Sequence, residues 1–223
     1  MPSREKKLLA FPVYPWVTPL DLVGPLTVLR NLTGTPYRTV VVDERIEQLN
    51  TQLALRILPA ATFADVPDPF AVIVPGGGPS ALAAMEDKAL VGYVRSAAAT
   101  AEIVGSTGNG ALVLAAAGLL EGRRAAVHWA YAEALASLGV TWVRERWVED
   151  GRFLTAAGGS AGIDMMLALL ARLKSPSGAQ LAQLFMEYDP QPPFGRLDPA
   201  TGDTELAALV RTPRTPGDSA GQW

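Results

Sequence analysis

The stretch that decides the fold is IVGSTGNGALVLAAAGLLEG, residues 103–122. It begins with a short apolar run typical of a buried strand, continues through a glycine-containing turn, and ends in a segment that predicts an apolar helix. Many enzymes place a nucleophile at the sharp turn between such a strand and such a helix. Here the turn carries Gly108, which has no side chain. The stretch therefore predicts an α/β fold whose elbow lacks a nucleophile.

Strand-like and helix-like segments alternate along the rest of the chain. Strands are predicted at residues 7–14, 37–43, 71–74, 102–106 and 125–128, with short edge strands within 50–59 and a hairpin of 140–148 with 152–155. Helices are predicted at residues 21–32, from 80 onward, at 89–99 and at 110–120. Further helices are predicted after 128 and through 138, at 162–173 and at 178–186. This alternation indicates a mostly parallel sheet that is covered by helices on both faces.

Length and composition limit the function classes. The 223 residues, 49% of them hydrophobic, suit one domain over 1–195, and residues 196–223, rich in Pro, Gly and Thr, are expected to form a flexible tail. A net charge of -3 argues against a nucleic-acid partner. The sequence lacks a membrane-span-length apolar run and the pattern of a signal peptide, so we expect a cytoplasmic protein.

Cysteine and histidine usage excludes several chemistries. The sequence has no cysteine, which excludes disulfides, thiolate metal sites and cysteine catalysis. Its one histidine is His128, so a histidine cluster for zinc is impossible. No tight acidic cluster suggests Mg²⁺. We therefore expect neither a metal nor another cofactor.

Asp21 is the candidate catalytic residue. In one interpretation it lies at or near the N-cap of the predicted 21–32 helix, the commonest reason for Asp at that place. In the other it is a general acid/base, because burial among apolar neighbours raises the pKa of a carboxyl group. In both interpretations Gly24 and Pro25 fall in the first turn of the helix, where a proline is tolerated.

Glycine turns follow two of the predicted strands. In open α/β sheets ligands bind beyond the carboxyl ends of the strands, where we expect Asp21, the turn at residues 76–78 and the turn at Gly108 and Asn109. Backbone N–H groups in such turns would hold an oxyanion or a polarised carbonyl, with Gly77 and Gly78 as candidates. Alternatively, the glycines only permit tight turns, and Asn109 is only a turn or cap residue rather than a substrate contact.

Other polar and aromatic residues near these turns are weaker candidates. A lone histidine such as His128 is more often structural than catalytic. Ser106 and Thr107 have no adjacent base in the sequence that would activate them, so we interpret them as structural. Tyr14, Trp16 and Trp129 can line an apolar cavity for a hydrophobic substrate, or pack in the core or a dimer contact.

The motifs together resemble a known family. The segment GNGALVLAAAGLLEGRRAAVHW resembles the elbow of the DJ-1/PfpI superfamily, which usually reads C-T-G-A-x-x-L-A-x-A-G-L-L-x-G-x-x-A-T-x-H-W. The segments VTPLDLVGPLTVL, VIVPGGG, TAAGGSAGIDMMLALL and EYDPQPPFG resemble its isonitrile hydratase branch. The resemblance covers roughly residues 7–195 and implies a flavodoxin-like, class I glutamine amidotransferase-like α/β sandwich and a homodimer.

The resemblance also implies site residues, with one large departure. In isonitrile hydratases of this family an elbow cysteine attacks the substrate carbon, an aspartate matching Asp21 handles protons, and amides of the elbow and the glycine loop help to hold the substrate. Here Gly108 matches the cysteine and Asn109 the threonine that follows it. Thiolate-dependent isonitrile hydration, glyoxalase, deglycase and peptidase activities are therefore excluded.

Two functions remain. The first is a cofactor-free acid/base enzyme on a small organic substrate, of cyclase, hydratase, lyase or isomerase type, in which Asp21 moves the proton in a pocket enlarged by the missing cysteine; a role in specialised biosynthesis is conceivable. Its expected substrate contacts are Gly77, Gly78, Gly108, Asn109, His128 and Trp129. The second is a non-catalytic pseudoenzyme that binds a small molecule or a protein partner.

Overall fold

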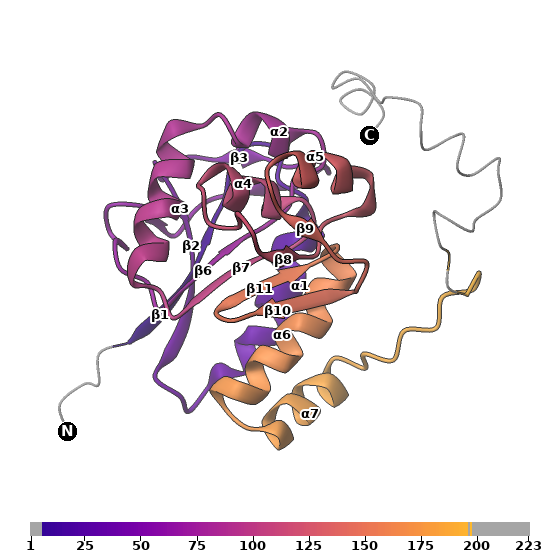
Figure 1. Cartoon of the computed structure of the whole chain (residues 1–223). Coiled ribbons are helices and arrows are strands. Elements are labelled where there is room, and N and C mark those ends of the chain that lie inside the picture. Colours follow the sequence, from indigo (N-terminus) through magenta and orange to yellow (C-terminus); the bar gives the residue numbers. More distant parts are fainter. Residues whose placement is uncertain (1–5, 196, 198–223) are drawn as a thin grey trace.

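A central sheet of seven strands organises the molecule (Figure 1). The computed structural model describes residues 6–195 and Leu197, so all but Leu197 of the predicted tail lies outside the described residues. In spatial order the strands are β10 (Trp147–Asp150), β11 (Phe153–Ala156), β7 (Ile103–Ser106), β6 (Ala71–Val74), β1 (Lys7–Pro12), β2 (Tyr37–Asp43) and β5 (Ala61–Thr62). The β10–β11 pair is antiparallel, and the other pairs of this sheet are parallel in the part of the chain described. The predicted fold class is confirmed.

Helices cover both faces of the sheet (Figure 1). One layer holds α1 (Pro19–Leu29), α6 (Gly159–Leu173) and α7 (Pro176–Phe185), and the other holds α2 (Ser80–Ala84), α3 (Lys88–Thr100), α4 (Gly110–Ala116) and α5 (Ala132–Ser137). Successive side chains of a strand point to opposite faces, so Leu9 and Phe11 of β1 join the core on the α1 and α6 side, whereas Ala10 joins the other core. Burial on both faces explains why these strands read as continuous apolar runs.

Short strands and two 3₁₀ turns, η1 (Arg30–Leu32) and η2 (Trp129–Tyr131), complete the fold. β3 (Leu49–Asn50) and β4 (Arg56–Ile57) form a separate antiparallel pair. The predicted hairpin was too long, because β9 (Thr141–Trp142) pairs parallel with β8 (Arg124–Ala125) rather than with β11. The strand predicted at 125–128 was likewise wrong beyond Ala125. Within the described residues, none of the helices combines the length and the apolar character that crossing a membrane requires.

Helix ends differ from the sequence prediction for local reasons. The predicted 110–120 helix stops at Ala116, because Gly118 adopts a φ of 75° and the Leu119 N–H turns back to the Leu114 carbonyl at 3.1 Å. The last helix begins at Pro176, and the Ser175 hydroxyl caps it by accepting the Gly178 N–H at 3.0 Å. Each boundary follows from a capping interaction.

The sheet order determines where the loops meet. β1, β6 and β7 are neighbours, and their carboxyl ends lie at the same edge. The chain leaves β1 for α1 on one face, whereas it leaves β6 for α2 and α3 on the other. Such a switch in direction leaves a crevice at the carboxyl ends of the strands, which is where ligands bind in open α/β sheets.

Candidate active site

The loops after β1, β6 and β7 are joined by hydrogen bonds. The Thr18 N–H donates to the Gly76 carbonyl at 2.8 Å, which connects the β1 loop to the glycine loop, residues 76–78. The Thr107 hydroxyl donates to the backbone carbonyl of Asp21 at 2.8 Å, which connects the elbow, residues 107–109, to helix α1. The convergence of these three loops, predicted from the sequence, is confirmed.

The elbow is a tight turn that requires glycine. Gly108 has a φ of 55°, in the left-handed region that residues with a side chain rarely adopt. Gly110, at the first position of α4, lies so close to the Val74 carbonyl that a side chain there has no room. Within the described residues, the N–H groups of Gly108 and Asn109 make no hydrogen bond.

Asp21 is not the helix cap that its position suggested. Helix α1 begins at Pro19, with Thr18 at the N-cap position, because proline fits the first helical position where no N–H is needed. Asp21 therefore lies in the first turn, and its side chain does not cap the helix. It is only 6% exposed, and its Oδ1 has no hydrogen-bond partner in the described structure. Burial raises the pKa of the Asp21 carboxyl group to about 6.

The Asp21 carboxyl group fills the space that a side chain at the elbow would take. A Cβ built on Gly108 would lie 2.8 Å from Oδ1 and 3.2 Å from Cγ of Asp21. Such distances are shorter than van der Waals contact. The expectation that glycine simply enlarges the pocket was therefore wrong, because the space is shared with the carboxyl group.

Pro25 explains why Asp21 is attached to the elbow. Pro25 lies inside α1, not in its first turn as predicted. In an α-helix the N–H of residue 25 would donate to the carbonyl of residue 21, and proline has no N–H. The Thr107 hydroxyl supplies the missing donor to the Asp21 carbonyl. The helix thus tolerates an interior proline, and the backbone of Asp21 is fixed against the elbow.

Asn109 clamps the glycine loop onto the elbow. Its side chain is 3% exposed, its Oδ1 accepts the Gly77 N–H at 2.9 Å, and its Nδ2 donates to the Gly78 carbonyl. It makes no side-chain cap to its own helix. The Gly77 N–H, expected to face an oxyanion, is thus already engaged. Gln52 holds the other side of this loop by donating to the Gly77 carbonyl.

Two tyrosines belong to this site, and sequence reasoning assigned neither of them a polar role there. Tyr14 is 2% exposed, and its hydroxyl donates to the Pro75 carbonyl at 2.9 Å. Burial raises the Tyr14 pKa, and the nearby Asp21 and Tyr131 raise it further. Partial burial also raises the Tyr131 pKa, whereas the Asn109 side chain acts to lower it. The sequence did offer a signal for Tyr131. It lies in the segment AVHWAY, residues 126–131, shortly after the candidate residues His128 and Trp129.

His128 and Trp129 lie at the start of η2, at the edge of the site. The His128 Nδ1 accepts the Ala130 N–H at 3.3 Å, so the ring caps this 3₁₀ turn. Trp129 is 38% exposed, and its ring centroid is 5.2 Å from that of His128. Both side chains are exposed, unlike Asp21 and Asn109.

Ser106 lies within the central sheet, and Trp16 lies beside β3 and β4. Ser106 is fully buried at the end of β7, and its Oγ has no hydrogen-bond partner in the described part of the chain. It pairs in register with Val74 and Thr155, and the Thr155 hydroxyl accepts the Ala126 N–H. Trp16 lines a different pocket, beside β3 and β4.

Proteins of known sequence and structure are similar to this chain. Isonitrile hydratase of Pseudomonas putida is 41% identical over 205 residues, which cover 91% of this chain and 86% of that protein. A crystal structure of a ThiJ/PfpI family protein from Pseudomonas syringae superimposes with a TM-score of 0.87 at 34% identity, covering 94% of this chain and 86% of the other.

A transcriptional regulator is also similar. An HTH-type regulator of Pseudomonas aeruginosa, CdhR, is 37% identical over 127 residues, which cover 55% of this chain and 35% of the regulator. The sequence profile of the DJ-1/PfpI family matches residues 7–172, most of the described chain. The chain therefore belongs to the DJ-1/PfpI family.

Proposed function

We propose that this protein is a cofactor-free acid/base enzyme in which Asp21 moves a proton on a small organic substrate. One feature supports this function above all: a carboxyl group with a pKa of about 6 lies buried at the strand ends, with Oδ1 unpartnered in the described structure. A group with a pKa near the working pH both gives and accepts a proton readily. Hydration, elimination, isomerisation and ring closure all require such a transfer.

The likeness to isonitrile hydratase supports a catalytic, hydratase-like role in general. Since this chain has no cysteine, the reaction proceeds without a thiolate. Hydration of an isonitrile adds water across the terminal carbon and gives an N-substituted formamide. In this proposal protonated Asp21 gives its proton to that carbon, water forms the C–O bond, and the carboxylate then takes a proton from the added water. The resulting formimidic acid becomes the formamide when a proton moves from its oxygen to its nitrogen. An aliphatic isonitrile is therefore the first substrate to test.

The elbow supplies the second part of the proposed mechanism. The N–H groups of Gly108 and Asn109 have no acceptor among the described residues, and they lie at the turn that contacts Asp21. Preorganised N–H donors of this kind stabilise the negative charge of an enolate or alkoxide oxygen, which develops in elimination, isomerisation or ring closure rather than in the hydration described above. Asn109 and Gln52 keep this turn and the glycine loop in place, so the donors need no rearrangement during the reaction.

The second candidate function is binding without catalysis. The similarity to a transcriptional regulator favours it, because part of that regulator resembles over half of this chain. In this alternative the Asp21 carboxyl group recognises a hydrogen-bond donor of a ligand and transfers no proton. The homodimer and the cytoplasmic location expected from the sequence stay predictions for either function.

Exchange of Asp21 for asparagine separates the two functions. Asp21→Asn keeps the size of the side chain and removes the transferable proton, so we expect turnover of the isonitrile to fall by about 10²–10⁴-fold with little change in ligand affinity. Formamide production, followed by mass spectrometry, measures the rate. Glu133→Gln, the same exchange on the exposed surface of α5, is the matched control and should keep full activity. Equal turnover in wild type and Asp21→Asn would contradict the acid/base proposal.

A further inference from the structure

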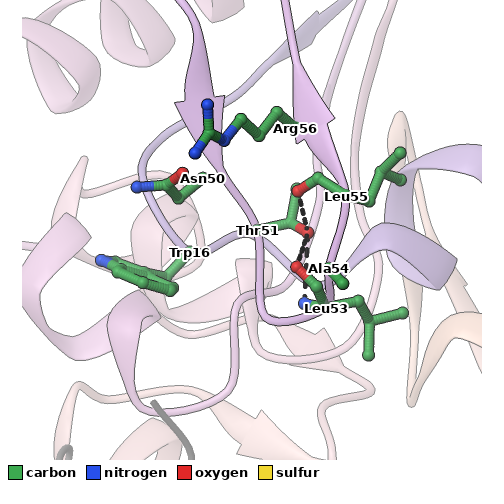
Figure 2. Close-up of a pocket in the computed structure, with 7 residues that line it drawn as sticks. All are labelled: Trp16, Asn50, Thr51, Leu53, Ala54, Leu55 and Arg56. Atoms are coloured by element: carbon green, nitrogen blue, oxygen red, sulfur yellow. Dashed lines mark hydrogen bonds between the residues drawn. The ribbon is translucent and has the colours of Figure 1, made fainter. Parts of the chain in front are cut away.

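An open pocket of about 460 Å³ lies beside the loop that joins β3 and β4 (Figure 2). We call it the Trp16 pocket, and it is lined by Trp16, Asn50, Thr51, residues 53–55 and Arg56. Its volume is in the range of pockets that take small molecules. It shares no lining residue with the candidate active site, which contains Asp21, Gly108 and Asn109.

The backbone of Trp16 is held in an unfavourable conformation. Its φ is 65°, which is a strained value for a bulky residue. The Trp16 N–H donates to the Asn50 carbonyl at 2.8 Å, and the Ser80 hydroxyl donates to the Trp16 carbonyl at 2.9 Å. These bonds fix the backbone, while the indole stays 46% exposed instead of packing in the core. Strain that orients an exposed aromatic ring suggests a binding role.

Arg56 and Asn50 place polar donors next to this ring. They are register partners in the antiparallel β3–β4 pair, so their side chains extend from the same face. In Figure 2 both side chains point to the side on which the Trp16 ring lies. The Arg56 guanidinium donates to the Gln48 side-chain oxygen at 3.3 Å, and no carboxylate pairs with it in the described portion of the chain. Among the described residues this cation therefore has no carboxylate counterion.

We propose that the Trp16 pocket binds a small aromatic carboxylate. A guanidinium matches the geometry of a carboxylate, and the Asn50 amide adds a further N–H donor. The Trp16 indole offers a rigid apolar surface for a flat ring, and such aromatic pairs contribute beyond the area they bury. This ligand fits the one charge, the one amide and the one aromatic side chain that the pocket exposes. The proposal does not depend on the chemistry of Asp21.

Phenylacetate and its neutral analogue phenylacetamide test the charge requirement. Titration into the full chain, followed by the indole N–H signal of Trp16 in NMR, should show saturable binding of phenylacetate and at least about tenfold weaker binding of phenylacetamide, because one charge-assisted bond is worth about 1.5–3 kcal/mol. The indole N–H signal that is absent from the spectrum of Trp16→Phe is the signal of Trp16. Arg56→Gln should weaken phenylacetate binding at least about tenfold and leave phenylacetamide unchanged.

Two further variants separate binding from folding and from the candidate active site. Trp16→Gly removes the strain and the ring, so its melting temperature should not fall although phenylacetate binding is lost. Asp21→Asn should leave phenylacetate binding intact. Binding that disappears in Asp21→Asn, or survives Arg56→Gln, would overturn the proposal. The proposal would also be overturned if the wild-type protein were a dimer that binds no phenylacetate and that dissociates when Arg56 is exchanged for Gln. This face would then be a contact between two copies of the chain.

Discussion

Asn109 and Asp21 are both buried polar residues at the same loops, yet their side chains differ in hydrogen bonding. Asn109 has both its amide oxygen and its amide nitrogen bonded to the glycine loop. Asp21, with a similar burial, leaves Oδ1 without a partner in the described structure. A buried polar group normally finds a partner, because an unsatisfied one costs free energy. The difference shows which residue holds the site together and which remains available to a ligand.

Burial of the Asp21 carboxyl group therefore lowers the stability of the fold, and a function of this group can explain why it is kept. A buried carboxylate without a cation nearby is unfavourable, and its raised pKa reflects that penalty. Proteins tolerate such groups chiefly where activity requires them. The backbone of Asp21 is at the same time well fixed by Thr107. The site thus combines a rigid frame with one buried acid whose Oδ1 has no partner in the described structure.

Removal of the Asn109 clamp should have the largest effect on stability. Asn109→Ala leaves the Gly77 N–H and the Gly78 carbonyl without partners, so we expect unfolding free energy to fall by about 2–4 kcal/mol. Urea denaturation measures it. Asn109→Asp should be no milder at neutral pH, because it keeps the acceptor for Gly77 but buries a carboxylate against the Gly78 carbonyl. A loss below about 0.5 kcal/mol for Asn109→Ala would show that the clamp is not structural.

A side chain at the elbow should disturb Asp21 as well as the backbone. In Gly108→Ala the left-handed φ costs about 1–2 kcal/mol, and the new methyl group also presses on the Asp21 carboxyl group. Gly118→Ala is the matched control, because Gly118 has a φ of 75° but nothing within 4 Å of a built Cβ. We expect Gly108→Ala to lose more stability than Gly118→Ala and to reduce turnover. Equal losses in the two variants would argue against the contact with Asp21.

The smallest effect on stability is expected from loss of the hydrogen bond between the Thr107 hydroxyl and the Asp21 carbonyl, which replaces the helical bond that Pro25 cannot make. Thr107→Val keeps the shape of the side chain and removes the hydroxyl donor to the Asp21 carbonyl, which should cost about 1–2 kcal/mol. Thr107→Ser retains the hydroxyl group and should keep most of the turnover. Stability and turnover measured on both variants show whether the hydroxyl or the methyl group matters. Full stability of Thr107→Val would exclude the replacement bond.

Local sequence patterns predicted much of the fold. The strands at 37–43 and 71–74 are confirmed to the residue, because the second is a continuous apolar run and the first is rich in β-branched and aromatic residues. The start of α1 was wrong, since proline at position 19 competes with aspartate as a start signal. The short β8–β9 pair was missed, because two-residue strands carry no periodic pattern.

The candidate site was predictable in its position but not in its bonding. The rule that loops meet at carboxyl strand ends brought Asp21, the glycine loop and the elbow together. The side-chain bonds between them join residues 32 and 86 positions apart, which no local pattern encodes. For the same reason, the sequence could not predict that the Asp21 carboxyl group lies where a Cβ on Gly108 would be.

The pKa of Asp21 is the most direct measurement, obtained by following its side-chain carboxyl carbon by NMR against pH. The account predicts a value of about 6, raised by burial. Because the folded pKa then exceeds the unfolded one, the contribution of Asp21 to stability is full below about pH 4 and is lost as the pH rises through 6, by up to about 3 kcal/mol. Asp21→Asn should lack this loss. A pKa of 4 or lower, with the same pH dependence in both proteins, would contradict the claim that a buried acid with a raised pKa lies at the elbow.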